Sequence, residues 1–79
     1  MNERRAQQRM RSLKTAMIIF NRRWSTIDCT VRNLSKMGAC LQVGDQVAVP
    51  DSFELEFDAT NHRCQVMWRK DNRLGVAFR

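Results

Sequence analysis

The chain has 79 residues, enough for one small domain but too few for a deep active site with several walls. No apolar run approaches the roughly 20 residues that cross a bilayer, and no apolar stretch follows the basic N-terminus as it would in a secretory signal. Fourteen Lys and Arg residues against eight Asp and Glu residues give a net charge of +6, so we expect an anionic partner.

Residues 1–12 are polar and lack apolar periodicity, which predicts a flexible basic arm. The first 14 residues carry a net charge of +4, because Glu3 opposes five cations: Arg4, Arg5, Arg9, Arg11 and Lys14. Most cations of the chain are arginine, whose planar guanidinium binds phosphates and guanine edges in bidentate fashion. A solvated tail that only aids solubility is the alternative left open by charge alone.

From Leu13 onward apolar residues recur with a period of two, which predicts β-strands. An apolar run covers 14–20, and polar loops or turns are expected at 21–25, Gly44-Asp45 and Asp71-Asn72. The inward-facing residues of the other five strands are expected to be Ile27, Cys29 and Val31; Ala39, Leu41 and Val43; Phe53, Leu55 and Phe57; Cys64, Val66 and Trp68; and Leu74, Val76 and Phe78. Six short strands with one apolar face predict an all-β fold, a six-stranded antiparallel barrel over residues 13–79 with little or no helix.

The remaining notable side chains favour structural interpretations. The three cysteines are odd in number, lack CxxC spacing and lie among apolar residues, which indicates small buried side chains in a reducing, cytoplasmic compartment. His62 has no partner at ligand spacing, so no metal site is expected. Trp24 is expected to fold back onto the barrel, with a contact to a partner or membrane surface as the alternative.

The segment Asn33-Leu34-Ser35-Lys36-Met37-Gly38 lies between two expected strands. Asn33 and Ser35 should share one face, opposite Leu34, and present an amide and a hydroxyl that suit the edge of a nucleobase. Gly38 allows a positive φ or a close approach of ligand to backbone. The structural alternatives are an Asx or serine turn for Asn33 and Ser35, and a bulge for Gly38.

Arg5 and Arg9 form an RxxxR pair on the arm, and two such side chains could hold both a guanine and a phosphodiester. The spacing alone carries little weight, because Arg69 and Arg73 repeat it. The order of the two motifs is more specific: RxxxR precedes the first strand, and NxSxxG follows 24 residues after Arg9.

This arrangement resembles the PilZ domain, a bacterial receptor module for cyclic di-GMP, whose pattern is RxxxR followed by [DN]xSxxG. The segments GACLQV, VGDQV and VMWRKDNRLGVAFR extend the resemblance over nearly the whole chain. It implies a PilZ-like split barrel in which Arg5 and Arg9 clasp guanine and phosphate. Asn33 and Ser35 would bond guanine or the adjacent phosphate, and Gly38 would permit close approach.

The resemblance also assigns Arg4, directly before RxxxR, a part in setting whether one or two stacked ligands bind, and an arginine there is compatible with an intercalated cyclic di-GMP dimer. Two features depart from the pattern. Many members continue into a helix after the last strand, whereas this sequence ends at Arg79, so such a lid is not expected. Asn33 in place of aspartate gives up a charge-assisted hydrogen bond.

The sequence therefore predicts a bacterial, cytoplasmic cyclic di-GMP receptor that orders its arm on binding and signals to an unidentified protein effector. No cofactor, metal, DNA partner or membrane span is expected. An enzyme is disfavoured, since no nucleophile–base pair or paired carboxylates can be recognised. Two alternatives remain: a basic barrel that binds nucleic acid, and a PilZ-like adaptor that has lost nucleotide binding.

Overall fold

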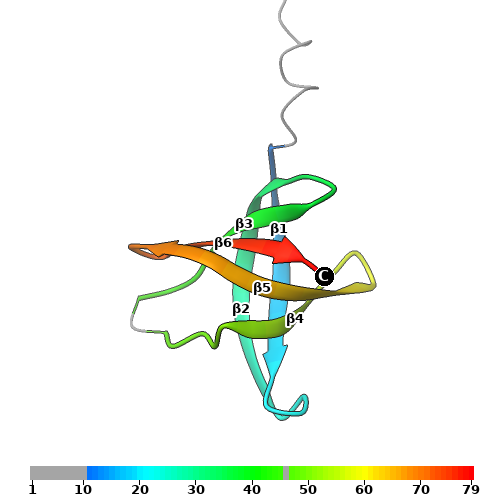
Figure 1. Ribbon diagram of the computed structural model, residues 1–79, viewed down its shortest axis with the longest axis vertical. Helices are drawn as coiled ribbons and strands as arrows, with labels where there is room; N and C mark the ends of the chain where they lie inside the picture. The colour runs from blue at the N-terminus through cyan, green and yellow to red at the C-terminus, as the bar shows by residue number, and fades with distance from the viewer. Residues whose placement is uncertain (1–10, 46) are drawn as a thin grey trace, which may run out of the picture.

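The computed structural model describes residues 11–45 and 47–79, which form an antiparallel barrel (Figure 1). The strands within these ranges are β1 (Arg11–Phe20), β2 (Ser25–Leu34), β3 (Gly38–Gln42), β4 (Ser52–Phe57), β5 (Thr60–Lys70) and β6 (Arg73–Phe78). Their order around the closed barrel is β1-β2-β3-β6-β5-β4, because β1 pairs with both β2 and β4. The expected all-β, six-stranded barrel is confirmed. Across the described ranges, no helix is long and apolar enough to cross a membrane.

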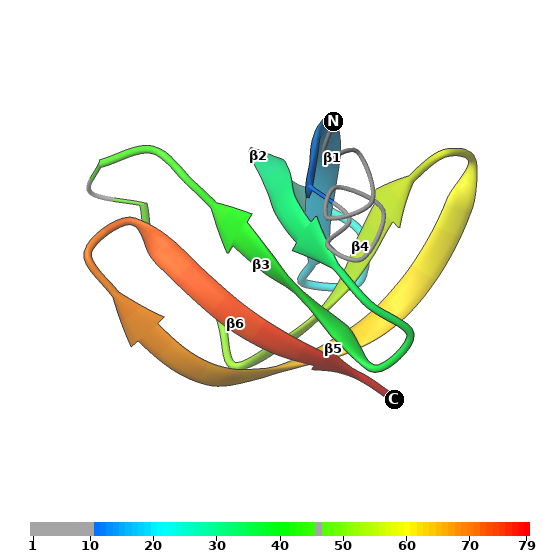
Figure 2. The ribbon, with the colours of Figure 1, turned by 90° about the horizontal axis from the view of Figure 1, so that it is seen from above.

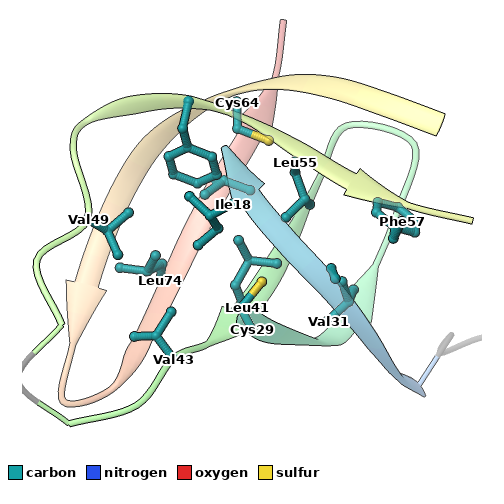
Figure 3. Packing of buried hydrophobic residues seen from close by; sticks show 13 residues of the cluster. Ile18, Cys29, Val31, Leu41, Val43, Val49, Leu55, Phe57, Cys64 and Leu74 are labelled. Atoms are coloured by element: carbon teal, nitrogen blue, oxygen red, sulfur yellow. The ribbon is translucent and has the colours of Figure 1, made fainter. Parts of the chain in front are cut away.

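Alternating apolar residues fill the barrel interior, as Figure 3 shows. Ile18, Val31, Leu41 and Leu55 have no exposed surface and form its centre. The residues expected to face inward from β2, β3 and β4 do so, since they are buried or packed against the buried cluster. The pattern was correct wherever the strand ladder is regular, because successive side chains of a strand point to opposite faces.

All three cysteines were expected to be buried, and the structure confirms this for two of them but not for Cys40. Cys29 and Cys64 are buried, and Cys40 is half-buried. Burial raises the pKa of the Cys29 thiol to about 12, with smaller contributions from Asp28 and Cys64. Burial likewise raises the pKa of Cys64 to about 11. Both side chains therefore stay protonated at neutral pH and serve as small apolar residues.

Three turns connect the hairpins β1–β2, β4–β5 and β5–β6. The β4–β5 turn has two residues, Asp58 and Ala59, whose φ values of 53° and 59° match the type I′ turn of tight hairpins. The expected turn at Asp71-Asn72 is confirmed between β5 and β6, with Asp71 left-handed. The β1–β2 turn spans residues 21–24 and ends the long hairpin at the bottom of Figure 1.

Bulges interrupt the ladder at three places in the described chain. The register shifts between Arg11 and Lys14 in β1, between Val31 and Asn33 in β2, and between Val66 and Trp68 in β5. An extra residue in one strand inverts the alternation that follows it. After the β2 bulge Asn33 is exposed and Leu34 packs against the core, the arrangement expected for the motif.

Both tryptophan predictions were wrong. Trp68 was expected in the core but is 48% exposed, because the β5 bulge turns it to the outer surface. Trp24 was expected to fold back onto the barrel but is 84% exposed at the tip of the β1–β2 hairpin. The alternation could not reveal either outcome, since a bulge and a loop both break the period of two.

Candidate functional site

A groove of about 420 Å³ runs over the outer surface of the barrel, across the strands that lie side by side in Figure 2. It begins at the β2–β3 connection, crosses β3 and β6, and ends at β5. The residues that line it are Asn33, Leu34, Ser35, Met37, Gly38, Ala39, Cys40, Met67, Trp68, Gly75, Val76 and Ala77. The NxSxxG motif therefore lines the same groove as Trp68, which was expected in the core.

One lateral row of paired residues connects the two sides of the groove. Asn33 of β2 pairs with Cys40 of β3, Cys40 pairs with Gly75 of β6, and Gly75 pairs with Trp68 of β5. Three strand spacings separate Asn33 from Trp68, a span of about 14 Å. Each flanking residue follows a bulge in its own strand, so the two bulges bring a polar amide and an indole to the same outer face.

The floor of the groove between these flanks is built from small residues. Cys40 and Gly75 occupy the row itself, and Gly38 and Ala77 form the next outward-facing pair of β3 and β6. A Cβ atom at Gly75 would overlap the Trp68 indole, which therefore lies directly against the glycine backbone. Because Gly75 has no side chain, the Trp68 indole can rest against its backbone.

Ser35 holds the β2–β3 turn through its hydroxyl. The backbone N–H groups of Met37 and Gly38 each donate to Ser35 Oγ at 3.2 Å, and Ser35 Oγ lies 3.3 Å from the Gly38 carbonyl, to which it donates. The Ser35 N–H donates to the same carbonyl at 2.9 Å. The serine turn considered as the structural alternative is thus present. A ligand bond to Ser35 Oγ would compete with contacts that already use its donor and both acceptor sites.

Gly38 has a packing role of its own. A Cβ atom there would overlap the Val76 carbonyl oxygen and crowd Ala77 Cα, so only glycine lets β3 approach β6 this closely. The φ of Gly38 is not in the left-handed region, so the position does not need glycine for its backbone conformation. The close contact that Gly38 permits is with the β6 backbone, while its predicted role toward a ligand stays a prediction.

Asn33 is the motif residue whose side chain is exposed beside the groove. It is exposed, and among the described residues its amide makes no hydrogen bond. Because a side-chain amide offers two donors and one acceptor oxygen, Asn33 can bond the edge of a bound group without breaking an existing contact. The motif thus divides into Ser35 and Gly38, which shape the turn, and Asn33, which faces the groove.

The groove lining contains no charged side chain. The ion pairs of the described residues lie elsewhere, as for Arg23 with Glu54 at 2.6 Å and Arg69 with Asp51 at 2.7 Å. Nor do three His, Cys, Asp or Glu side chains gather into a metal-binding group in the ranges that the structure covers. The groove thus offers apolar and hydrogen-bonding surface, and charge for an anion must come from other residues.

The predicted arm residues Arg4, Arg5 and Arg9 lie outside the described residues. The first described residue, Arg11, begins β1 and pairs with Asn33. Sequence reasoning missed Trp68, Cys40 and Gly75 as groove residues. A usable signal was present, because small residues occupy every second position at 38 and 40 and again at 75 and 77, the outward positions of two paired strands.

Comparison with known proteins identifies a family but no individual relative. A search of curated proteins and a search of solved structures each found no match. The family model of the PilZ domain matches residues 3–79, a range that includes both motifs and every described strand. The expected resemblance is confirmed at this level: the chain belongs to the PilZ domain family.

Proposed function

We propose that the protein is a receptor for cyclic di-GMP and that the ligand binds in the groove beside Asn33. PilZ domains are a known family of cyclic di-GMP receptors, and their role is ligand binding and signalling. Cyclic di-GMP carries two guanines and two phosphates. The proposed site matches these groups with an amide, an apolar surface and the arginines of the N-terminal arm.

The observation that carries the proposal is the pairing of Arg11 with Asn33. Paired residues of antiparallel strands lie about 5 Å apart, and two residues of chain span at most about 7 Å. Covalent connectivity therefore keeps the Cα of Arg9 within about 12 Å of Asn33. This limit on the distance supports a site shared by the RxxxR and NxSxxG motifs, which are far apart in the sequence.

Each part of the proposed site has a separate task. Asn33 bonds the edge of one guanine, and the exposed face of Trp68 offers that base or its neighbour a stacking surface. Arg5 and Arg9 supply the charge that the groove lining lacks and bind phosphate and guanine. Ser35 and Gly38 hold the loop in place. Arg4 favours a second, intercalated ligand molecule.

The proposed output is a changed surface. Binding orders the arm over the groove, and a protein effector in the bacterial cytoplasm recognises the new surface. Ordering a segment costs about 2–5 kcal/mol, so the new contacts must exceed this free energy before binding is observed. We propose no chemical step for this site.

Titration calorimetry with cyclic di-GMP tests the proposal. We expect a dissociation constant of about 1 μM or lower, equivalent to about 8 kcal/mol. Arg5→Ala, Arg9→Ala and Asn33→Ala should each remove or strongly weaken binding. Arg73→Ala is the matched control, because Arg73 belongs to the second RxxxR pair and lies outside the groove. A folded protein that releases no binding heat, or equal loss in the control, would refute the proposal.

Because both tryptophans are exposed, binding of a nucleic acid is the competing function to consider. Trp68 was expected in the core but is exposed, so its indole could stack on a base of a bound nucleic acid. However, the tip that carries Trp24 lies eight residues along β2 from the row that contains Trp68, or about 26 Å, too far for one continuous stacking track. Salt dependence separates the two functions, because polyanion affinity falls steeply with ionic strength and binding of a two-phosphate ligand falls only weakly.

A further inference from the structure

The tip of the β1–β2 hairpin presents a tryptophan to solvent. Trp24 is 84% exposed, more than any other large hydrophobic side chain of the described residues. The tip, residues 21–24, projects at the bottom of the barrel in Figure 1, at the far end of the β1–β2 ladder from Asn33. An indole so exposed is outside the core and outside the proposed ligand groove.

The backbone and side chains of the tip hold Trp24 in this position. The Trp24 N–H donates to the Asn21 carbonyl at 2.9 Å, and Asn21 Nδ2 donates to Ser25 Oγ at 3.3 Å. Arg23 is drawn to the barrel wall, where its guanidinium pairs with Glu54 at 2.6 Å. Three consecutive residues, 21–23, have left-handed φ values of 56°, 55° and 70°, a conformation that arginine adopts only at a cost. The hydrogen bonds hold the backbone of the turn, and the Trp24 indole projects from it into solvent.

The charge beside the indole is positive. Arg22 is exposed and, within the described chain, makes no ion pair, whereas Arg23 is partly neutralised by Glu54. Asn21 and Ser25, on either side, are polar, so Trp24 has no adjacent apolar side chain that would be buried together with it. An indole with a polar N–H and an adjacent cation is the combination found where proteins contact the headgroup region of membranes.

We propose that this hairpin tip docks on an anionic membrane surface, with Trp24 at headgroup depth and Arg22 on a lipid phosphate. A protein partner fits the tip less well, because a stable protein interface buries about 800 Å² per partner over 20–30 residues, far more than one convex four-residue turn. A bilayer interface accepts a single side chain without a matching pocket. Docking by the tip leaves the groove, about 26 Å away along β2, open to its ligand.

The chain provides its own reporters, since it contains two tryptophans and no tyrosine. In Trp68→Phe, Trp24 is the only tryptophan and its emission reports on the tip alone. We expect the emission to shift to shorter wavelength with vesicles that contain phosphatidylglycerol, and to stay unchanged with vesicles of phosphatidylcholine only. Arg22→Ala in the same background should weaken binding about fivefold, the effect of one cation near an anionic surface, and salt should reverse the shift.

Co-sedimentation of the unaltered protein with the same vesicles makes the test independent of the Trp68 substitution. Trp24→Ala should reduce the bound fraction, while its cyclic di-GMP affinity and melting temperature stay unchanged because the side chain is exposed. Equal sedimentation of Trp24→Ala and the parent would show that the basic arm carries any membrane binding and would overturn the proposal. The absence of an emission shift, or of sedimentation with anionic vesicles, would also overturn the proposal. This is the result expected if the tip binds a protein or a nucleic acid instead.

Discussion

The groove across β3, β6 and β5 and the tip of the β1–β2 hairpin each bring a tryptophan to the surface, but by different physical means. At the groove, a bulge turns Trp68 outward, and Gly75 gives the indole a place against the backbone. At the tip, a hydrogen-bonded turn holds Trp24 away from every core residue. The groove therefore depends on tight packing of small residues, whereas the tip depends on local backbone geometry. Substitutions of the groove's small residues should therefore disturb the fold, and substitution of Trp24 at the tip should not.

Gly38→Ala should produce the largest loss of stability. The new Cβ atom would overlap the Val76 carbonyl oxygen, and backbone atoms of a closed barrel cannot move aside easily. We expect a loss of about 3 kcal/mol in the free energy of unfolding, measured by urea denaturation. Gly44→Ala is the control, because a Cβ there meets only Val47 Cγ2 at 3.8 Å, an ordinary contact. Equal effects of both substitutions would contradict the packing role of Gly38.

Gly75→Ala should have a smaller effect, since the obstacle is a side chain that can move. The Cβ atom would displace the Trp68 indole into solvent, at a cost of about 1–2 kcal/mol. Trp68 emission, observed in a Trp24→Phe background, should move to longer wavelength. Unchanged emission would mean that the indole does not rest on Gly75.

Ser35→Ala and Asn33→Ala should separate the two parts of the motif. Loss of the Ser35 hydroxyl leaves the N–H groups of Met37 and Gly38 without an acceptor, and we expect a loss of about 1 kcal/mol. Asn33→Ala removes an exposed amide and should change stability by less than about 0.5 kcal/mol. Thermal unfolding measures both effects. A larger loss for Asn33→Ala than for Ser35→Ala would reverse the proposed division.

Thiol labelling should probe the groove with the least disturbance. At about pH 8 Cys29 and Cys64 stay protonated, because burial raises their pKa values to about 12 and about 11, and only thiolates react rapidly. Cys40 is half-buried on the groove floor and should be the cysteine that reacts in the native protein. Cyclic di-GMP should slow its labelling. Mass spectrometry of the labelled peptides measures the labelling of each cysteine. Rapid labelling of Cys40 at saturating ligand would contradict a ligand bound in the groove.

Much of the fold could be predicted from the sequence, because alternation in 53–57 and 39–43 continues without interruption and small chains favour closed sheets. The turn at Asp71-Asn72 also follows from its residue types. Trp68 could not be placed, because its side-chain direction depends on an extra residue in β5 that no local pattern marks. Trp24 was misplaced because a general preference for burial does not apply at a turn that projects from the barrel.

The candidate site was only partly predictable. The pattern of Asn33, Ser35 and Gly38 identified the correct loop, but not which residue shapes the turn and which faces the groove. That division depends on contacts with Met37 and Val76, which become visible only when β3 is paired with β6. The predicted roles of Arg4, Arg5 and Arg9 concern residues outside the described ranges and stay predictions.

The most direct test is a titration of Trp24→Phe with cyclic di-GMP, followed by the emission of Trp68 as the only tryptophan. We expect a saturable emission change with a midpoint of about 1 μM or lower, lost in Arg9→Ala and Asn33→Ala but kept in Arg73→Ala. Binding heat without any change at Trp68 would place the ligand outside the groove. An unchanged emission without binding heat, in a folded protein, would contradict the proposed receptor function itself.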